Sequence, residues 1–243
     1  MMTLLFAAFL FRGGILTGWE VRPPVYACPR IEREMALDGR LSDPLWKTAP
    51  AVRLVFADSG EAADRPTEVR LLYSATTLYV GFVCQDDFVW GTKSEPDSDV
   101  YTEECVEVFL NPAGVPHQYY EINVSPKNVV FDACILNPRT PSAPGLKFTG
   151  LKDYHPEGLE TRVHVDGELD KSGGAKSWTV EYAIPLSRLI GAPHIPPRKG
   201  DAWRMNLYRI DSPEPGRRKY YAWNPTEKID FHRPWRFGIL LFQ

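Results

Sequence analysis

Carboxylate side chains gather in the stretch VYTEECVEVFLNPAG, residues 100–114, where they interrupt an otherwise apolar segment. Glu103, Glu104 and Glu107 follow Tyr101 closely along the chain. Carboxylates can act as acid–base catalysts, as ligands of hard cations, or as hydrogen-bond acceptors for hydroxyl groups. The alternation of a strand places Glu103 and Glu107 on one face and Glu104 on the other.

Catalysis by carboxylates alone is not indicated by this spacing. The paired carboxyls of glycosidases stand roughly 5 to 10 Å apart, whereas Glu103 and Glu107 would be roughly 13 Å apart along a strand. A carboxyl from another strand is therefore required, and Glu121 and Asp132 are the candidates. A serine hydrolase is not indicated, because the GxSxG motif is absent and the five histidines fall in or beside turns or polar strands, as expected of surface residues. A hydrolase that uses Glu107 or Glu121 with Asp132 is kept as an alternative function.

Metal binding is a second interpretation of the acidic residues. The sequences Asp86-Asp87 and Asp97-Ser98-Asp99 occupy predicted loops beside apolar strands. Clustered carboxylate oxygens suit Ca²⁺, but neither loop matches the twelve-residue EF-hand pattern. A hydrated acidic loop is the simpler interpretation, and a structural Ca²⁺ at Asp97 or Asp99 is the metal hypothesis.

Aromatic residues are more informative. The 12 Phe, 11 Tyr and 7 Trp exceed what the core of a sandwich requires. Several of them stand next to turns: Tyr101, Trp223, Phe231 and Trp235. An exposed aromatic plane packs against the C–H face of a sugar ring, while carboxylates and amides bind its hydroxyls. Glu107, Glu121 and Asn123 place such polar groups on neighbouring predicted strands, which favours a sugar-binding groove.

The elements that position these residues are predicted to be strands. Short apolar segments separated by turn residues indicate strands near 67–74, 77–85, 104–111, 117–125, 128–136, 159–167, 177–185, 201–210, 219–224 and 236–242. Helical signals are limited to two short turns, one from Asp43-Pro44 through Trp46 and one over residues 185–189. This pattern predicts an all-β protein, an antiparallel β-sandwich of about ten strands.

Length, charge and cysteine spacing bound the remaining alternatives. The 243 residues carry a net charge of −3. Their single basic run is Arg217-Arg218-Lys219, which is expected at a hairpin tip. Nucleic-acid binding is therefore not indicated. The apolar run Thr3 to Phe11 is too short to span a membrane; residues 1–24 are predicted as a leader or tail and residues 25–243 as one domain. The four cysteines lack CxxC spacing, and we interpret them chiefly as small buried apolar residues, with one or two disulfides open if the protein is exported.

A series of motifs then resembles a known family. ALDGRLSDPLWKTAP, PTEVRLLYSATTLYVGFVCQDD, DSDVYTEECVEVFLNPAG with YYEINVS, SWTVEYAIP, GDAWRMNLYRID and YAWNPTEKIDFHRPWRFGILLF follow one another in the order seen in family 9 carbohydrate-binding modules. The resemblance extends from about residue 25 to residue 242. It implies a jelly-roll-like β-sandwich that binds sugars without cleaving them.

The resemblance also implies a site and a setting. It places the two rings that enclose the sugar at Tyr101 and Phe231, and the polar groups at Glu107, Asn123, Asn206 and Tyr208, with Glu121 where the family has a basic residue. Ca²⁺ is common in the family, and its members accompany secreted glycoside hydrolases, which implies an extracellular or periplasmic location. A module that docks on another protein without a sugar ligand is the third hypothesis. The sequence does not fix the oligomeric state.

Overall fold

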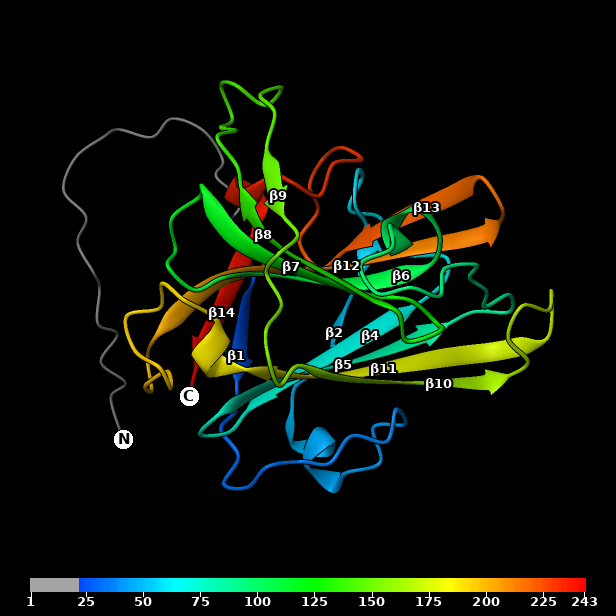
Figure 1. Ribbon diagram of the computed structural model, residues 1–243, viewed down its shortest axis with the longest axis horizontal. Helices are drawn as coiled ribbons and strands as arrows, with labels where there is room; N and C mark the ends of the chain where they lie inside the picture. Colours follow the sequence, from blue (N-terminus) through cyan, green and yellow to red (C-terminus); the bar gives the residue numbers. More distant parts are fainter. Residues whose placement is uncertain (1–21) are drawn as a thin grey trace, which may run out of the picture.

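The chain forms a β-sandwich of two sheets that face each other (Figure 1). The computed structural model describes residues 22–243; the expected leader, residues 1–24, lies outside this range except for its last three residues. Within the described range, no helix is long and apolar enough to span a membrane.

The larger sheet has nine strands and carries the residues of the predicted site. Its main path runs β1-β14-β12-β6-β7-β8-β9, and β13 pairs with both β12 and β3. The strands are β1 (Val25–Cys28), β3 (Val55–Phe56), β6 (Cys105–Asn111), β7 (Gln118–Val124), β8 (Val130–Leu136), β9 (Thr149–Leu151), β12 (Ala202–Glu214), β13 (Arg217–Ala222) and β14 (Gly238–Phe242). All the pairs are antiparallel except β1 with β14, which is parallel.

The smaller sheet has five strands in the order β10-β11-β5-β4-β2, all antiparallel. They are β2 (Val52–Arg53), β4 (Thr67–Tyr73), β5 (Thr77–Gln85), β10 (Glu160–Gly167) and β11 (Ala175–Pro185). Four short 3-10 turns complete the fold: η1 (Pro44–Thr48), η2 (Val100–Thr102), η3 (Leu186–Arg188) and η4 (Pro234–Arg236).

The nine-stranded sheet is buried on both faces. Val106, Val108 and Leu110 of β6 point into the core between the sheets. Their neighbours Cys105 and Phe109 point to the opposite side, where they join a second apolar cluster. Because successive side chains of a strand alternate between faces, the second cluster lies on the outer face of this sheet.

The outer face is covered by chain segments rather than by a third sheet. We call its apolar residues the outer-face cluster: Ala57, Val100, Cys105, Phe109, Tyr119, Val129, Phe131, Ala133, Ile135, Tyr208, Ile210, Ala222, Phe231 and Phe237. The cover consists of residues 137–150 and residues 225–237. Arg139 joins the two segments, since its Nε donates to the carbonyl of Leu146 at 2.6 Å and its Nη1 lies 3.2 Å from Asp230 Oδ2.

The segment of residues 31–49, which follows β1, packs against the five-stranded sheet, at the bottom of Figure 1. Trp46 of η1 donates from Nε1 to Glu181 Oε1 of β11 at 2.8 Å, and the backbone N–H of Gly39 donates to Oε2 of the same carboxylate. Asp43 caps η1 by accepting from the backbone N–H of Leu45, as its position before Pro44 predicts.

The predicted sandwich and all ten predicted strands are confirmed, with boundaries within about four residues, and both predicted helical turns form. The prediction omitted four short strands, β1, β2, β3 and β9, and did not anticipate the parallel pair at one edge. The basic run begins β13 just after the turn at residues 215–216, as expected of a hairpin tip. All four cysteines lie in the described range and are free there, three of them buried.

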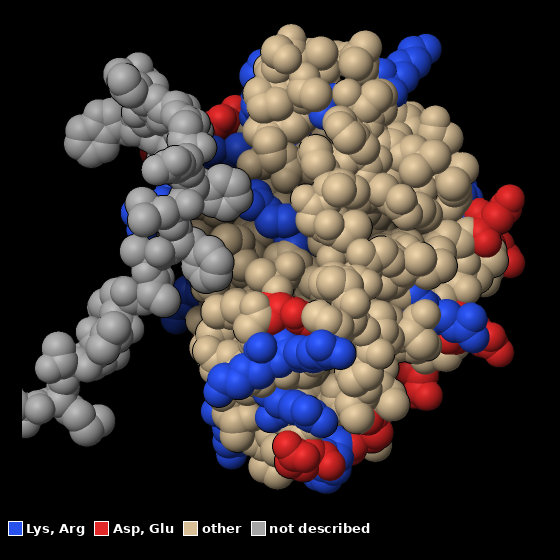
Figure 2. Space-filling view, turned by 90° about the vertical axis from the view of Figure 1, so that its left-hand side faces the viewer, with Lys and Arg blue, Asp and Glu red and all other residues tan. Residues whose placement is uncertain are grey.

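Charged residues are mixed on the face that Figure 2 shows. Lys and Arg gather in the lower part of this view beside Asp and Glu, and the upper part is largely uncharged. This face presents no extended surface of one sign, in line with a net charge of −3.

Candidate carbohydrate-binding site

A cavity of about 390 Å³ opens on the outer face of the nine-stranded sheet. Strands β6, β7, β8, β12 and β13 form its floor, and the covering segments with η2 form its walls. Its lining consists of Tyr101, Glu107, Glu121, Phe131, Ile135, Phe148, Gly150, Lys152, Ile210, Tyr220, Ile229, Asp230, Phe231 and His232. The cavity is within the size range of small-molecule sites and is mainly apolar with a few polar groups.

Two of its aromatic walls are the rings predicted from the sequence. Tyr101 of η2 is half-buried, contacts the edge of Phe131 at 5.2 Å between ring centroids, and donates from its hydroxyl to Asp99 Oδ1 at 2.7 Å. Phe231 is 8% exposed and stacks on Tyr208 at 4.0 Å with an interplanar angle of 10°. Both rings therefore reach the same cavity, Tyr101 from a surface turn and Phe231 from a supported position.

The floor carries two glutamates. Glu107 of β6 and Glu121 of β7 are 2% and 5% exposed. Glu107 Oε1 accepts a weak hydrogen bond from the Cys105 thiol at 3.4 Å, and Glu121 Oε1 accepts from Asn123 Nδ2 at 2.8 Å. Strand register places Asn123 opposite Glu107 and Glu121 opposite Phe109, so the two carboxyls lie diagonally across adjacent strands.

Burial favours the protonated forms of these two carboxyls. Desolvation raises the pKa of Glu107 well above its usual value, and the negative charge of Glu121 raises it further. Desolvation also raises the pKa of Glu121 to about 7, an effect reduced by the Asn123 hydrogen bond and by the charge of Lys152. Near neutral pH the pair therefore presents one protonated carboxyl, which can donate, beside a partly ionised one, which accepts.

His232 borders the glutamates and is uncharged. Desolvation, together with the nearby charge of Arg139, lowers its pKa to about 3. Asn137 Nδ2 donates to the Tyr119 hydroxyl at 3.0 Å, and this hydroxyl shares a hydrogen bond of 2.8 Å with His232 Nδ1. The other ring nitrogen, Nε2, is 3.9 Å from Glu121 Oε2.

Four of the seven predicted sugar-binding residues line the cavity: Tyr101, Glu107, Glu121 and Phe231. The other three lie behind the lining. Asn123 holds the Glu121 carboxylate, and Tyr208 supports the Phe231 ring and donates to the Phe231 carbonyl at 3.0 Å. Asn206 is fully buried and donates to the Tyr208 hydroxyl and to the carbonyl of Asn224, both at 2.9 Å.

Several lining residues were not anticipated from the sequence. Phe131 was predictable, because alternation along β8 places it on the same face as Ala133 and Ile135. Phe148, Lys152 and Asp230 come from loops whose path the sequence does not reveal. The expectation of surface positions is wrong for His232, which is largely buried because its ring stacks on Phe148 with centroids 3.8 Å apart.

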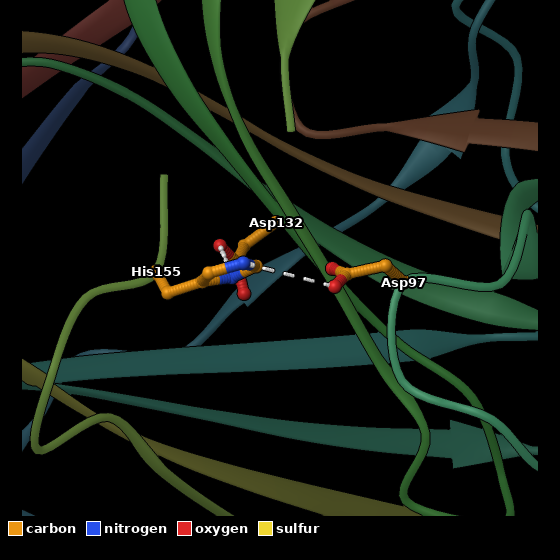
Figure 3. Close-up of side chains that lie close together, drawn as sticks. All are labelled: Asp97, Asp132 and His155. Carbon is orange, nitrogen blue, oxygen red and sulfur yellow. Dashed lines mark ion pairs between the residues drawn. The ribbon is translucent and has the colours of Figure 1, made fainter. Parts of the chain in front are cut away.

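The predicted metal residues Asp97 and Asp99 point to different surroundings. Asp99 Oδ1 accepts from Tyr101 and from Lys152 Nζ at 3.0 Å. Asp97 lies near Asp132 and His155 (Figure 3). His155 stands between them, with Nδ1 3.4 Å from Asp132 Oδ1 and Nε2 4.0 Å from Asp97 Oδ2.

This trio does not fit Ca²⁺ well. Ca²⁺ takes six to eight oxygen ligands, whereas the trio offers two carboxylates and an imidazole whose two nitrogens face different partners. An imidazole bridging two carboxylates accounts for the arrangement. Ca²⁺ at Asp97 or Asp99 stays a prediction that a chelator can test.

The position of Asp132 corrects the alternative function. Phe131 and Ala133 belong to the outer-face cluster, so Asp132 between them points away from the cavity. Asp132 cannot serve Glu107 or Glu121 as a catalytic partner. Burial raises the pKa of Asp132 to about 6, an effect that the charge of His155 opposes.

The fold and this cavity define a class: a β-sandwich with an aromatic and carboxyl-lined ligand pocket on the outer face of one sheet. The family model "Carbohydrate family 9 binding domain-like" matches residues 37–243. The chain belongs to this family.

One curated relative and two solved structures are similar to this chain. A protein of the fungus Arthroderma benhamiae named "Extracellular protein" is 29% identical over 184 residues, covering 72% of this chain and 78% of the relative. A Bacteroides uniformis protein with a proposed carbohydrate-binding role superposes with a TM-score of 0.73 at 16% identity, covering 91% and 100% of the two chains. A family 9 module of Caldicellulosiruptor kristjanssonii, solved with cellotriose, gives 0.62 at 13% identity, covering 90% and 94%. At these identities the solved structures show the shared fold.

Proposed function

We propose that this protein binds a carbohydrate, a single sugar or the end of a sugar chain, in the outer-face cavity and does not cleave it. One observation carries the proposal: Tyr101 and Phe231 line the same cavity as Glu107 and Glu121. Ring planes can pack on a sugar while the carboxyls bind its hydroxyls. Family membership supports this function, as do the cellotriose and glucose complexes of family 9 modules from C. kristjanssonii.

Calorimetric titration with glucose, xylose, cellobiose, xylobiose and uronic acids tests the proposal. We expect saturable binding of at least one of these sugars, with modest affinity because a small ligand offers few atoms for contact. Phe88→Ala serves as a matched control, because Phe88 is also partly buried and stacks on Trp90, outside the cavity. Absence of binding across the panel, or equal weakening by Phe88→Ala and Tyr101→Ala, would contradict the site.

The glutamate pair favours a hydrolase as a second candidate function. Two carboxyls in one cavity with pKa values raised to different extents can divide the roles of acid and base. Turnover of aryl-glycosides that Glu107→Gln and Glu121→Gln each abolish would support it. Binding of sugars without turnover would support the non-catalytic function.

The setting follows from the same proposal. We infer that the protein works outside the cytoplasm, beside glycoside hydrolases that degrade polysaccharides. The name of the A. benhamiae relative supports an extracellular location for this chain. Immunodetection in the culture medium of the producing organism, with a cytoplasmic marker protein as control, tests the location, and co-purification of a glycoside hydrolase tests the partner.

A further inference from the structure

Two of the charged or ionisable side chains around the cavity, Glu107 and Glu121, have no cationic partner among the described residues. Among the lining residues the acidic ones are Glu107, Glu121 and Asp230, and the basic one is Lys152. Asp230 is paired with Arg139, and Lys152 Nζ lies 3.0 Å from Asp99 Oδ1. Within residues 22–243, neither Glu107 nor Glu121 has a lysine or arginine nitrogen within 4.0 Å.

The nearby side chains do not replace the missing cation. His232 is uncharged, Asn123 supplies one neutral N–H to Glu121, and Cys105 supplies a weak thiol donor to Glu107. A buried carboxyl avoids the cost of an unpaired charge either by keeping its proton, as this pair largely does in the free protein, or by pairing with a cation. This pair is exposed to the cavity, which is the one place from which a cation can reach both groups.

The walls are equally suited to a positive charge. Five aromatic rings line the cavity: Tyr101, Phe131, Phe148, Tyr220 and Phe231. The faces of such rings attract cations through their quadrupole. Three of these rings already do so: Lys152 lies over Phe131, Arg139 over Phe148 and Arg218 over Tyr220, at 4.8–5.6 Å from the ring centroids.

We propose that the cavity selects a sugar that carries a free amino group, and that Glu107 and Glu121 receive its ammonium while the rings enclose the sugar ring. This inference rests on the proposed function and names the ligand class for the same site. An ammonium offers three N–H donors and a positive charge to two carboxyl groups that receive only one amide N–H, from Asn123, and one weak thiol donor, from Cys105. The volume of about 390 Å³ accommodates a ligand larger than a simple alkylamine.

Glucosamine, glucose, N-acetylglucosamine and ethanolamine are the probes for this proposal. Titration calorimetry at pH 7 should show glucosamine binding at least tenfold tighter than glucose and N-acetylglucosamine, which have the same ring without the positive charge. Ethanolamine, an amine without a ring, should bind at least tenfold more weakly than glucosamine. Because a cation favours the ionised carboxyls, glucosamine should also release protons on binding, seen as a dependence of the heat on the ionisation enthalpy of the buffer.

Matched variants localise the effect. Glu121→Gln keeps the shape and removes the charge, so the preference for glucosamine over glucose should fall below threefold; Glu107→Gln provides a second variant. Glu157→Gln is the control, because it removes one negative charge from an exposed surface pair with Arg188. The preference of Glu157→Gln for glucosamine over glucose should equal that of the wild type.

The outcomes separate this proposal from the broader one. If neutral sugars bind as tightly as glucosamine, the amino-sugar proposal is wrong and carbohydrate binding stands. If ethanolamine matches glucosamine, the cavity is an amine site and the sugar ring plays no part. If none of the neutral or amino sugars binds, both proposals fail.

Discussion

Tyr101 and Phe231 line the same cavity, but the structure supports them to different extents. Tyr101 is half-buried on a short surface turn and is held by its hydrogen bond to Asp99 and its edge contact with Phe131. Phe231 belongs to the covering segment 225–237, is buried and stacks on the buried Tyr208. Removal of the Tyr101 ring should therefore affect mainly ligand binding, whereas removal of the Phe231 ring should affect both binding and stability.

We predict that Tyr101→Ala weakens sugar binding by about tenfold, roughly the value of one aromatic contact of 1–1.5 kcal/mol, with a small change in the free energy of unfolding. Phe231→Ala should weaken binding and also cost about 3 kcal/mol of stability, because it leaves a void beside Tyr208. Calorimetry with urea unfolding of both variants measures the difference. A large stability loss in Tyr101→Ala would mean that this ring belongs to the core.

Glu121 links the pocket to the pH dependence of stability. Its folded pKa of about 7 lies above the unfolded value near 4.3, so folding favours the protonated form. The stability that this group contributes is fully present below about pH 4.3 and is lost as pH rises through 7. The shift corresponds to a loss on the order of 3–4 kcal/mol.

Glu121→Gln should therefore raise the free energy of unfolding by about 3–4 kcal/mol at pH 8 and by little at pH 4.5. Denaturant unfolding at both pH values measures this. Glu157→Gln, which alters an exposed carboxylate, should show no such pH-dependent gain. An equal effect of Glu121→Gln at the two pH values would show that the carboxyl ionises normally in the folded protein.

At the scale of elements, a buried charge network connects the two sheets. Arg209 of β12 is fully buried; its Nη2 lies 2.5 Å from Asp86 Oδ2, just after β5, and 2.9 Å from Asp211 Oδ1. Its Nη1 donates to Thr67 Oγ1 of β4 at 3.1 Å. Burial, with the charge of Asp86 adding to it, raises the pKa of Glu104 beside this network to about 9. Glu104, one of the glutamates in the first stretch considered, thus belongs to the structural interior.

Arg209→Met should destabilise the protein by about 3–5 kcal/mol, because it removes one partner and leaves buried carboxylates without compensation. Arg217→Met, which alters an exposed pair with Glu214 in the adjacent hairpin, should cost less than about 0.5 kcal/mol. Chemical unfolding of both variants gives the comparison. Similar small losses would mean that Arg65, which also contacts Asp86 and lies 3.7 Å from Asp211 Oδ1, takes over the role of Arg209.

Strand alternation made much of the fold and the pocket floor predictable. Period two in residues 105–111 separates Val106 and Val108 from Glu107 and Phe109, and the structure places the two sets on opposite faces. The short strand β9 was not predictable, because Thr149–Leu151 is exposed and carries no alternating apolar signal. Its position is set by its pairing with β8, a contact between distant parts of the chain.

The walls of the pocket were only partly predictable for the same reason. Tyr101 and Phe231 were found through motifs, whereas Phe148 and His232 come together only when two covering segments meet. Asn206 and Tyr208 share a face with each other, as predicted, but alternation does not say whether a polar side chain on that face reaches the cavity, and neither of these two does. The Asn206 side chain is buried behind the lining, and its amide donates to the Tyr208 hydroxyl and the Asn224 carbonyl, so it is not available to a ligand.

At the scale of the whole molecule, the ligand pocket and the core between the sheets are separate. The core packs one face of the nine-stranded sheet, and the pocket lies on the other. A ligand can therefore enter without opening the core, and it adds its binding free energy to the native state alone.

Sugar binding should consequently raise the thermal midpoint of unfolding. At a ligand concentration of 100 times Kd the gain is about 2.7 kcal/mol, which for a chain of this size corresponds to a Tm increase of about 5–10 °C. Tyr101→Ala at the same ligand concentration should show a smaller increase, in proportion to its lost affinity, whereas Phe88→Ala should show the full one. Differential scanning calorimetry over a series of ligand concentrations measures these shifts. A Tm that is independent of ligand while calorimetry reports binding would mean that the sugar binds folded and unfolded chains equally well, which would rule out a site confined to the native pocket.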